Sequence, residues 1–186
     1  MSGHNKWSKI KNKKAVTDAA KSKIFSKMAK LISTASKQVH GDTSSPILRT
    51  AIDKAKGYNM PVDNINRAVK KGLGVDAEIM ETIVYESYGP GGSALIIEAL
   101  TSNHNKAAAE VKHILSKHGF ELAKQGSASW AFAKNQETNP STTLGAGDLE
   151  PITTIKLSEE DEQKLESLIE ELEDNDEVQS VYTNAE

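Results

Sequence analysis

Apolar residues recur at helical spacing through the first part of the chain. From residue 15 they stand three or four positions apart, which places them on one face of an α-helix, with the lysines largely off that face; the apolar positions are Val16, Ala20, Ile24, Met28, Leu31 and Ala35. Two shorter amphipathic segments follow, Pro46 to Gly57 and Pro61 to Gly72, and each opens on a proline, which favours the start of a helix. Residues 15–72 therefore predict a three-helix module.

Beyond residue 75 the apolar pattern changes from helical to alternating. Residues 82–88 and 93–100 predict two strands, and the Gly-Pro-Gly-Gly sequence at 89–92 predicts the turn of a hairpin between them. A helix follows that Asn103 or Asn105 can cap, with its apolar face formed by Ala108, Val111, Ile114 and Leu115. Residues 127–133 then predict a strand that carries Ala128, Trp130 and Phe132 on one side.

The last third of the chain adds a loop, a helix and two strands. Residues 135–151 have little pattern and predict a loop of 17 residues, which is uncommon inside a compact domain. A strand at 152–157, a helix opening on a capping box at Ser158 and Asp161, and a strand at 178–182 complete the order. The fold expected is α+β, with a basic helical domain at 1–75 and a ferredoxin-like α/β sandwich with a mostly antiparallel sheet at 76–186.

Charge divides the chain in the same place as the hydrophobic pattern. Residues 1–72 hold 16 of the 23 Lys and Arg but 4 of the 26 Asp and Glu, a net charge of +12, whereas the remaining 114 residues carry −15. Clustered cations release counterions when they bind phosphate, so a basic half of this kind indicates a polyanionic partner. Nucleic acid is the partner that the charge pattern favours.

The candidate contacts lie in an N-terminal arm and in the first helix. Lysine greatly outnumbers arginine there, which suits recognition of phosphate and shape better than bidentate reading of guanine, so we expect low sequence specificity. Trp7 could stack on a base or could hold the arm against the core of the protein. The nucleic-acid-binding residues expected, with His4 and Trp7 as auxiliary contacts, are His4, Lys6, Trp7, Lys9, Lys11, Lys13, Lys14, Lys21, Lys23, Lys27 and Lys30.

Other kinds of chemistry find little support. The chain has no Cys, which excludes disulfides and thiolate metal sites. His113 and His118 are about 140° apart around a helix axis, a poor pair of metal ligands. Neither a catalytic triad nor a phosphate-binding glycine loop is present, so we expect no enzymatic activity, no metal and no cofactor. No apolar run approaches the length of a membrane span and no signal-peptide core is present, which favours a cytoplasmic protein with no membrane partner.

Several strings of the chain together resemble the YebC/PmpR family. They are GHNKWSKIK (3–11), KIFSK (23–27), Arg49 to Lys54, NMP (59–61), DNI (63–65), YESYGPGG (85–92), GS (126–127) with Trp130 and Phe132, and VQSVYTN (178–184). The resemblance implies a non-enzymatic cytoplasmic protein with a helical N-terminal domain and α/β domains around a cleft. It also implies DNA-binding transcriptional regulation, as bacterial members are usually described, while mitochondrial relatives are translational activators and the family is linked to the ribosome and to relief of stalling on proline-rich stretches.

The chain departs from the family pattern at one place. Typical members carry a further small α/β domain between the Trp-Phe strand and the C-terminal helix, where this chain has residues 135–151 alone. The resemblance therefore implies a shortened member, and the loop at 135–151 is explained as the junction where an inserted domain is absent.

Three hypotheses about function follow. The first is a nucleic-acid-binding regulator of gene expression, with promoter DNA as its target or, alternatively, ribosomal RNA. The second is a protein-interaction module in which the acidic α/β half binds a basic partner such as a ribosomal protein, with a candidate partner loop at Tyr88, Gly89, Pro90, Gly91 and Gly92. The third, which the sequence supports least, is a metal-dependent hydrolase. The oligomeric state is left open.

Overall fold

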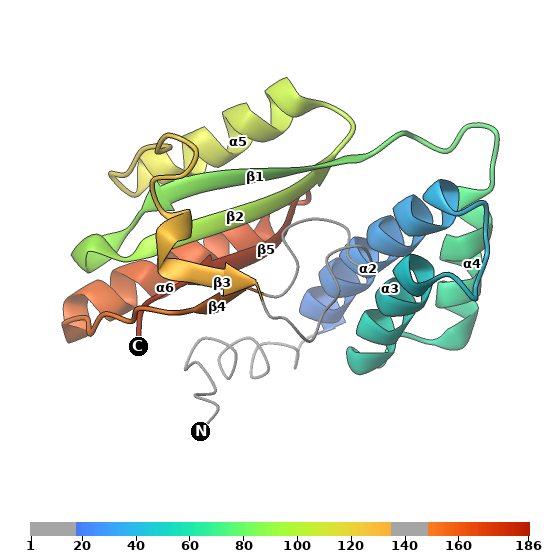
Figure 1. Ribbon diagram of the computed structural model, residues 1–186, viewed down its shortest axis with the longest axis horizontal. Coiled ribbons are helices and arrows are strands. Elements are labelled where there is room, and N and C mark those ends of the chain that lie inside the picture. Colours follow the sequence, from blue (N-terminus) through green and yellow to red (C-terminus); the bar gives the residue numbers. More distant parts are fainter. Residues whose placement is uncertain (1–17, 135–148) are drawn as a thin grey trace. The chain divides into compact units, whose positions relative to one another are not determined.

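The computed structural model describes residues 18–134 and 149–186. The chain divides after Ala77 into two compact units, here called the N-terminal unit (described from residue 18) and the C-terminal unit (78–185). Figure 1 shows a helical N-terminal unit, while sheet and helices combine in the C-terminal unit.

The N-terminal unit is built on its first described helix. Both α3 (Pro46–Gly57) and α4 (Val62–Gly72) pack against α2 (Asp18–Gln38), as the three-helix prediction requires. Pro61 stands one position before α4, as its N-cap, rather than inside the helix. The core is formed by the fully buried or nearly buried side chains of Met28, Ile32, Ala35, Leu48, Ala51, Ala55, Met60, Ile65 and Ala68.

The approach of α2 to α4 depends on two small residues. The buried Ser36 hydroxyl donates a hydrogen bond of 2.8 Å to the carbonyl oxygen of Val69, which joins the two helices. A Cβ atom at Gly72 would clash with the carbonyl oxygen of Ser33 and would lie 2.8 Å from the Cβ of Ser36. Glycine at position 72 therefore allows the end of α4 to lie directly against the backbone of α2.

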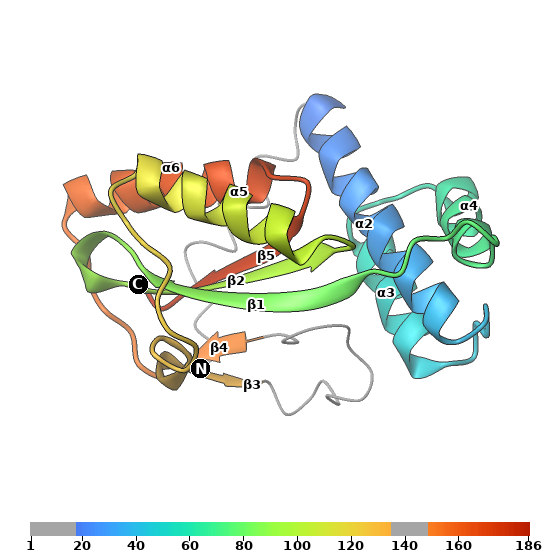
Figure 2. The same ribbon diagram turned by 90° about the horizontal axis from the view of Figure 1, so that it is seen from above.

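A three-stranded antiparallel sheet forms the centre of the C-terminal unit. Its order is β1 (Glu81–Tyr88), β2 (Ala94–Thr101) and β5 (Val178–Thr183). All eight residues of β2 are buried. Figure 2 shows the reason, because α5 (His104–Lys117) and α6 (Glu159–Asp174) lie on one face of the sheet and a two-stranded hairpin lies on the other.

The hairpin layer consists of β3 (Phe132–Lys134) and β4 (Leu149–Pro151), which pair in antiparallel fashion. Together with a short 3-10 turn, η2 (Ser129–Ala131), it covers the side of the sheet that carries Ala94 and Ile96. Phe132 and Ala131 are buried in this layer. The sheet is thus apolar on both sides, which accounts for the near-continuous apolar sequence of β2.

Both helices of the C-terminal unit begin at the caps that the sequence indicates. The Asn103 side chain accepts a hydrogen bond of 3.1 Å from the Lys106 amide, and the Ser158 hydroxyl accepts one of 3.2 Å from the Asp161 amide. The buried helix residues differ slightly from those expected, since Ala107 rather than Ala108 lies in the core. On α6 the buried residues are Leu165, Leu168 and Leu172.

Two of the predicted strands are wrong in position. Residues 127–133 were expected to alternate as one strand, but η2 takes up Ser129–Ala131 and the strand begins at Phe132. A 3-10 turn repeats every three residues, so Ala128 and Ala131 are buried while Trp130 is 54% exposed. Residues 152–157 form no strand beyond an isolated bridge between Ile155 and Ala185.

The strand expected at 152–157 lies earlier in the chain, at Leu149–Pro151, where it pairs with β3. The predicted loop of 135–151 therefore ends in a strand, and its remaining residues, 135–148, lie outside the described part of the chain. The α+β class and the antiparallel pairing are confirmed, with the strands divided between a sheet of three and a hairpin of two.

Replacing Gly72 by Ala should destabilise the N-terminal unit by about 1–3 kcal/mol, because the added methyl group has to push α4 away from α2. Gly57→Ala is the matched control: Gly57 also ends a helix, but a Cβ there meets nothing within 4 Å, so that variant should be neutral or up to about 1 kcal/mol more stable. Urea unfolding followed by circular dichroism measures both. Equal effects of the two substitutions would contradict close packing at Gly72.

Candidate functional site

The candidate nucleic-acid contacts fall into two groups in the structure. His4, Lys6, Trp7, Lys9, Lys11, Lys13 and Lys14 lie outside the described residues. Lys21, Lys23, Lys27 and Lys30 all lie on α2, within its first four turns. The structure therefore describes four of the eleven expected contact residues.

Three lysines of α2 form a line along the helix side opposite its buried residues. Lys23, Lys30 and Lys37 follow one another at steps of seven residues, so their side chains leave the helix in nearly the same direction and successive ones are about 10 Å apart. Lys27 lies beside this line, whereas Lys21 stands in line with the buried Met28. Lys21 is nevertheless exposed, as is Lys23, while Lys27 and Lys30 are half-buried.

One end of the lysine line is held by the protein itself. The ammonium group of Lys37 donates a hydrogen bond to the carbonyl oxygen of Ala77. Lys37 therefore helps to fix the segment after α4.

A second group of cations was not included among the expected contacts. Arg67, Lys70 and Lys71 are exposed on α4, and their spacing of three and four residues puts them on one side of the helix. Within the described residues none of the three forms an ion pair. These three residues were assigned no role from the sequence, although their spacing on the predicted helix was a usable signal.

The candidate partner loop at 88–92 is packed into the unit at its centre, while Tyr88, Gly91 and Gly92 are exposed. Gly89 and Pro90 are buried, and the Ser93 hydroxyl donates a hydrogen bond of 2.9 Å to the carbonyl oxygen of Pro90. Gly91 has a φ of 64°, and a Cβ atom there would lie 2.5 Å from a methyl carbon of Leu157. The glycine and proline residues thus have a role in forming a tight turn, and the large side chain that the loop exposes is Tyr88.

Beside that turn, the Glu86 carboxylate is buried, with 5% of the residue exposed. It accepts hydrogen bonds from three backbone amides: Gly126 at 2.7 Å, Ala128 at 2.6 Å and Ser129 at 3.0 Å. Burial raises the pKa of the Glu86 carboxyl, but the amides and the Ser129 hydroxyl outweigh that effect and hold the pKa below its ordinary value. Glu86 is therefore an ionised group that fixes residues 126–129 against β1.

Tyr88 and Trp130 form a connected pair on the same side of the sheet. The Trp130 indole Nε1 donates a hydrogen bond of 3.2 Å to the Tyr88 hydroxyl, which in turn donates to the carbonyl oxygen of Ser127. Tyr88 is 38% exposed and Trp130 is 54% exposed, so both residues reach solvent. The strings YESYGPGG and GS with Trp130, far apart in the sequence, meet at this point.

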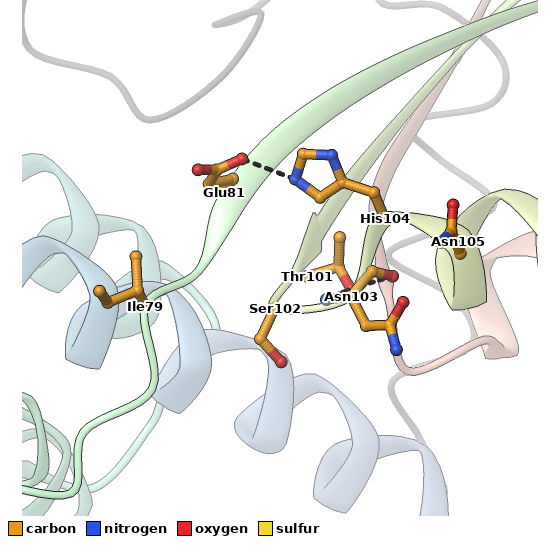
Figure 3. Close-up of a pocket in the computed structure, with 7 residues that line it drawn as sticks. All are labelled: Ile79, Glu81, Thr101, Ser102, Asn103, His104 and Asn105. Carbon is orange, nitrogen blue, oxygen red and sulfur yellow. Dashed lines mark hydrogen bonds and ion pairs between the residues drawn. The ribbon is translucent and has the colours of Figure 1, made fainter.

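A surface pocket of about 520 Å³ lies where β1 begins and β2 ends. In Figure 3 the His104 ring points toward the Glu81 carboxylate, and the distance from His104 Nε2 to Glu81 Oε2 is 2.6 Å. Both side chains of this pair are more than half exposed to solvent. The pocket is lined by Ile79, Glu81, Thr101, Ser102, Asn103, His104 and Asn105.

The described residues offer no clear metal site. Among them, no three His, Cys, Asp or Glu side chains converge as ligands would. His118 follows α5 as its C-cap and contacts Glu171, with 2.9 Å between Nε2 and Oε2. No helix in residues 18–134 or 149–186 has both the length and the apolar character required to cross a membrane.

Comparison with known proteins relates both units to one family. Residues 5–75 match the TACO1/YebC protein N-terminal domain, and residues 80–143 and 145–185 match the TACO1/YebC second and third domain. The chain belongs to the TACO1/YebC family.

Individual relatives support this membership. A protein of Thermoanaerobacter pseudethanolicus named "probable transcriptional regulatory protein" is 38% identical, with 100% of this chain and 97% of the relative covered. A protein of the same name from Trichlorobacter lovleyi is 45% identical, with 98% and 70% covered. The crystal structure of a conserved hypothetical protein of Aquifex aeolicus aligns with a TM-score of 0.74 and 30% identity, covering 91% of each chain.

The comparisons also concern the length of this TACO1/YebC member and the part of the chain between β3 and β4. The alignment with the Thermoanaerobacter protein runs over 239 positions, 53 more than the 186 residues of this chain. The match to the second and third domain is interrupted at residue 144, between β3 and β4. The relative therefore has positions in this alignment that have no counterpart in this chain.

Replacing Glu86 by Gln should lower the free energy of unfolding by about 1–3 kcal/mol near neutral pH, because the amide group presents an N–H donor to backbone donors. The pKa of Glu86 is depressed on folding, so its stabilising effect is present above the ordinary carboxyl pKa and is lost as the pH falls through the lower folded value. The difference in the free energy of unfolding between wild type and variant should therefore become smaller under acid conditions. Urea unfolding over a pH series measures it.

The exposed Glu121 provides a control for that experiment, since Glu121→Gln removes the same charge from the same unit without removing a buried carboxylate. A Glu86→Gln effect that equals the control, or that stays constant as the pH falls, would contradict the structural role of the ionised carboxylate.

Proposed function

We propose that this TACO1/YebC protein is a non-enzymatic regulator of gene expression in the cytoplasm, which binds nucleic acid through its basic N-terminal unit. The observation that carries the proposal is the concentration of 16 Lys and Arg against 4 acids in residues 1–72. On α2, Lys23 and Lys30 lie on one side with Lys27 beside them, which suits contact with a charged backbone, and the lysines of residues 1–17 extend the same basic segment of the sequence.

Duplex DNA is the first target to consider. Relatives from two bacteria are named probable transcriptional regulatory proteins. Lysine ammonium groups contact phosphate without reading bases, so affinity would come mainly from the backbone and sequence preference from elsewhere. Arg67, the exposed arginine of α4, is a residue that could add bidentate recognition.

Ribosomal RNA is the alternative target within the same proposal. A lysine-rich surface tolerates structured RNA as well as duplex DNA, since both present regularly spaced phosphates. Salt dependence separates the two cases, because contacts to phosphate alone weaken steeply as salt rises. We therefore propose to titrate purified ribosomes and duplex DNA over one salt series. Ribosome binding that persists near physiological salt while DNA binding collapses would favour translation, and the reverse would favour transcription.

Replacing Lys23, Lys27 and Lys30 together by Ala should weaken nucleic-acid binding by about tenfold or more and should reduce the salt slope by up to about 3, since each lost phosphate contact removes about 0.9 from the slope on duplex DNA. Alanine favours helix, so α2 should stay folded, which circular dichroism verifies. The matched control is Lys112→Ala with Lys124→Ala and Lys156→Ala, which removes the same charge from exposed positions of the C-terminal unit.

Equal losses in the two triple variants would mean that net charge alone sets the affinity, and the α2 surface would then be discarded as the contact. Replacing Lys9, Lys11 and Lys13 by Ala tests the N-terminal arm in the same assay. An affinity and salt slope unchanged by both the arm and the α2 variants would overturn nucleic-acid binding through this unit.

A further inference from the structure

The Tyr88 and Trp130 rings are exposed in a fixed arrangement. Two hydrogen bonds in series, from Trp130 to Tyr88 and from Tyr88 to Ser127, hold the rings together. The indole N–H and the tyrosine O–H are thus already used within the protein. What the pair offers to a partner is aromatic ring surface, which binds apolar groups and cations rather than hydrogen-bond acceptors.

The backbone beneath the two rings is held just as firmly. Residues 126–129 are fixed by the Glu86 carboxylate, so the turn that precedes Trp130 is ordered before any partner arrives. Next to Trp130 in sequence, Ala131 accepts a hydrogen bond of 2.9 Å from the amide of Ile152, whose side chain is 64% exposed. Rigid exposed aromatic side chains of this kind lose little entropy on binding, which makes them effective contact residues.

Charge decides which kind of partner suits this surface. The C-terminal unit, residues 78–185, contains 7 Lys and Arg against 20 Asp and Glu, a net charge of −13. Glu121 and Glu150 are exposed on segments that contact β1 and β3, with Lys124 as a nearby cation. Nine of the 20 acids lie on α6, on the sheet face opposite the hairpin layer, so the charge felt at the rings is that of the neighbouring segments, where the carboxylates of Glu121 and Glu150 attract a guanidinium or ammonium group and repel a phosphate.

We propose that Tyr88 and Trp130 form a docking site for an arginine-containing, positively charged polypeptide segment of a partner protein. Arginine stacks on an indole face more readily than other charged side chains, and the carboxylates of Glu121 and Glu150 on the neighbouring segments attract a basic segment. This interaction is separate from the proposed nucleic-acid binding, because it uses the other unit and requires a partner of opposite charge.

The test uses the full chain carrying Trp7→Phe, so that Trp130 is the remaining tryptophan and its fluorescence reports on the site. The probe is a short peptide of alternating arginine and glycine, and the matched neutral probe replaces each arginine by citrulline, which keeps the planar group but not the charge. We expect a saturable change in Trp130 fluorescence with the arginine peptide and about tenfold weaker binding of the citrulline peptide.

Variants then locate the binding, measured by anisotropy of the dye-labelled arginine peptide. Trp130→Ala should weaken binding about three- to thirtyfold, and Trp130→Phe, which keeps an aromatic ring, should weaken it less. Ile79→Ala is the control, because it removes an exposed apolar side chain of the same unit from the segment before β1, at the far end of that strand from Tyr88.

Three outcomes would overturn the proposal. The first is arginine and citrulline peptides that bind equally well, and the second is a Trp130→Ala variant that binds as the Ile79→Ala control does. The third is a single-stranded RNA that binds tighter than the arginine peptide and loses its affinity in Trp130→Ala, which would make the rings a base-stacking surface. Should Trp130→Ala fail to fold, the fluorescence titration of the Trp7→Phe chain with the two peptides decides the question.

Discussion

The C-terminal unit depends on one buried carboxylate. Glu86 lies on β1, two residues before the strand ends, and would be costly to bury as an anion without partners. Three backbone amides of residues 126–129 supply those partners, and the same hydrogen bonds draw this segment onto the sheet. The layer formed by η2, β3 and β4 can then cover Ala94 and Ile96. The hydrogen bonds that stabilise the ionised Glu86 carboxylate therefore help to bury one face of the sheet.

This dependence explains which parts of the fold could be predicted from the sequence. The helices were predictable because their apolar spacing and caps are local, as Asn103 and Ser158 show. Residues 127–133 were not, since their conformation is imposed by Glu86, some forty positions earlier in the chain, and not by their own alternation. The short strand β4 was misplaced for a similar reason, because pairing with β3 rather than local pattern determines it.

In the candidate site too, features set by neighbouring residues could be predicted, and contacts between residues far apart in the sequence could not. Composition was enough to find the basic segment, and helical spacing was enough to place Lys23 and Lys30 on one side of α2. The sequence could not reveal that Lys37 would be engaged by the carbonyl oxygen of Ala77, because that contact joins residues forty positions apart. Nor could it reveal that Trp130 would be exposed, since a tryptophan in an alternating apolar segment is more often buried.

The opposite charges of the two units need not cancel, although the chain as a whole has a net charge of −3 and a pI of about 6.0. In physiological salt the field of a surface charge fades over roughly 8 Å, a short distance compared with the size of either unit. A ligand at the surface of α2 therefore responds mainly to the lysines beside it, and a ligand at Trp130 responds mainly to the charges on the segments next to that side chain. Whole-chain charge is for this reason a poor guide to partners here, and two surfaces of opposite preference can coexist in one small protein.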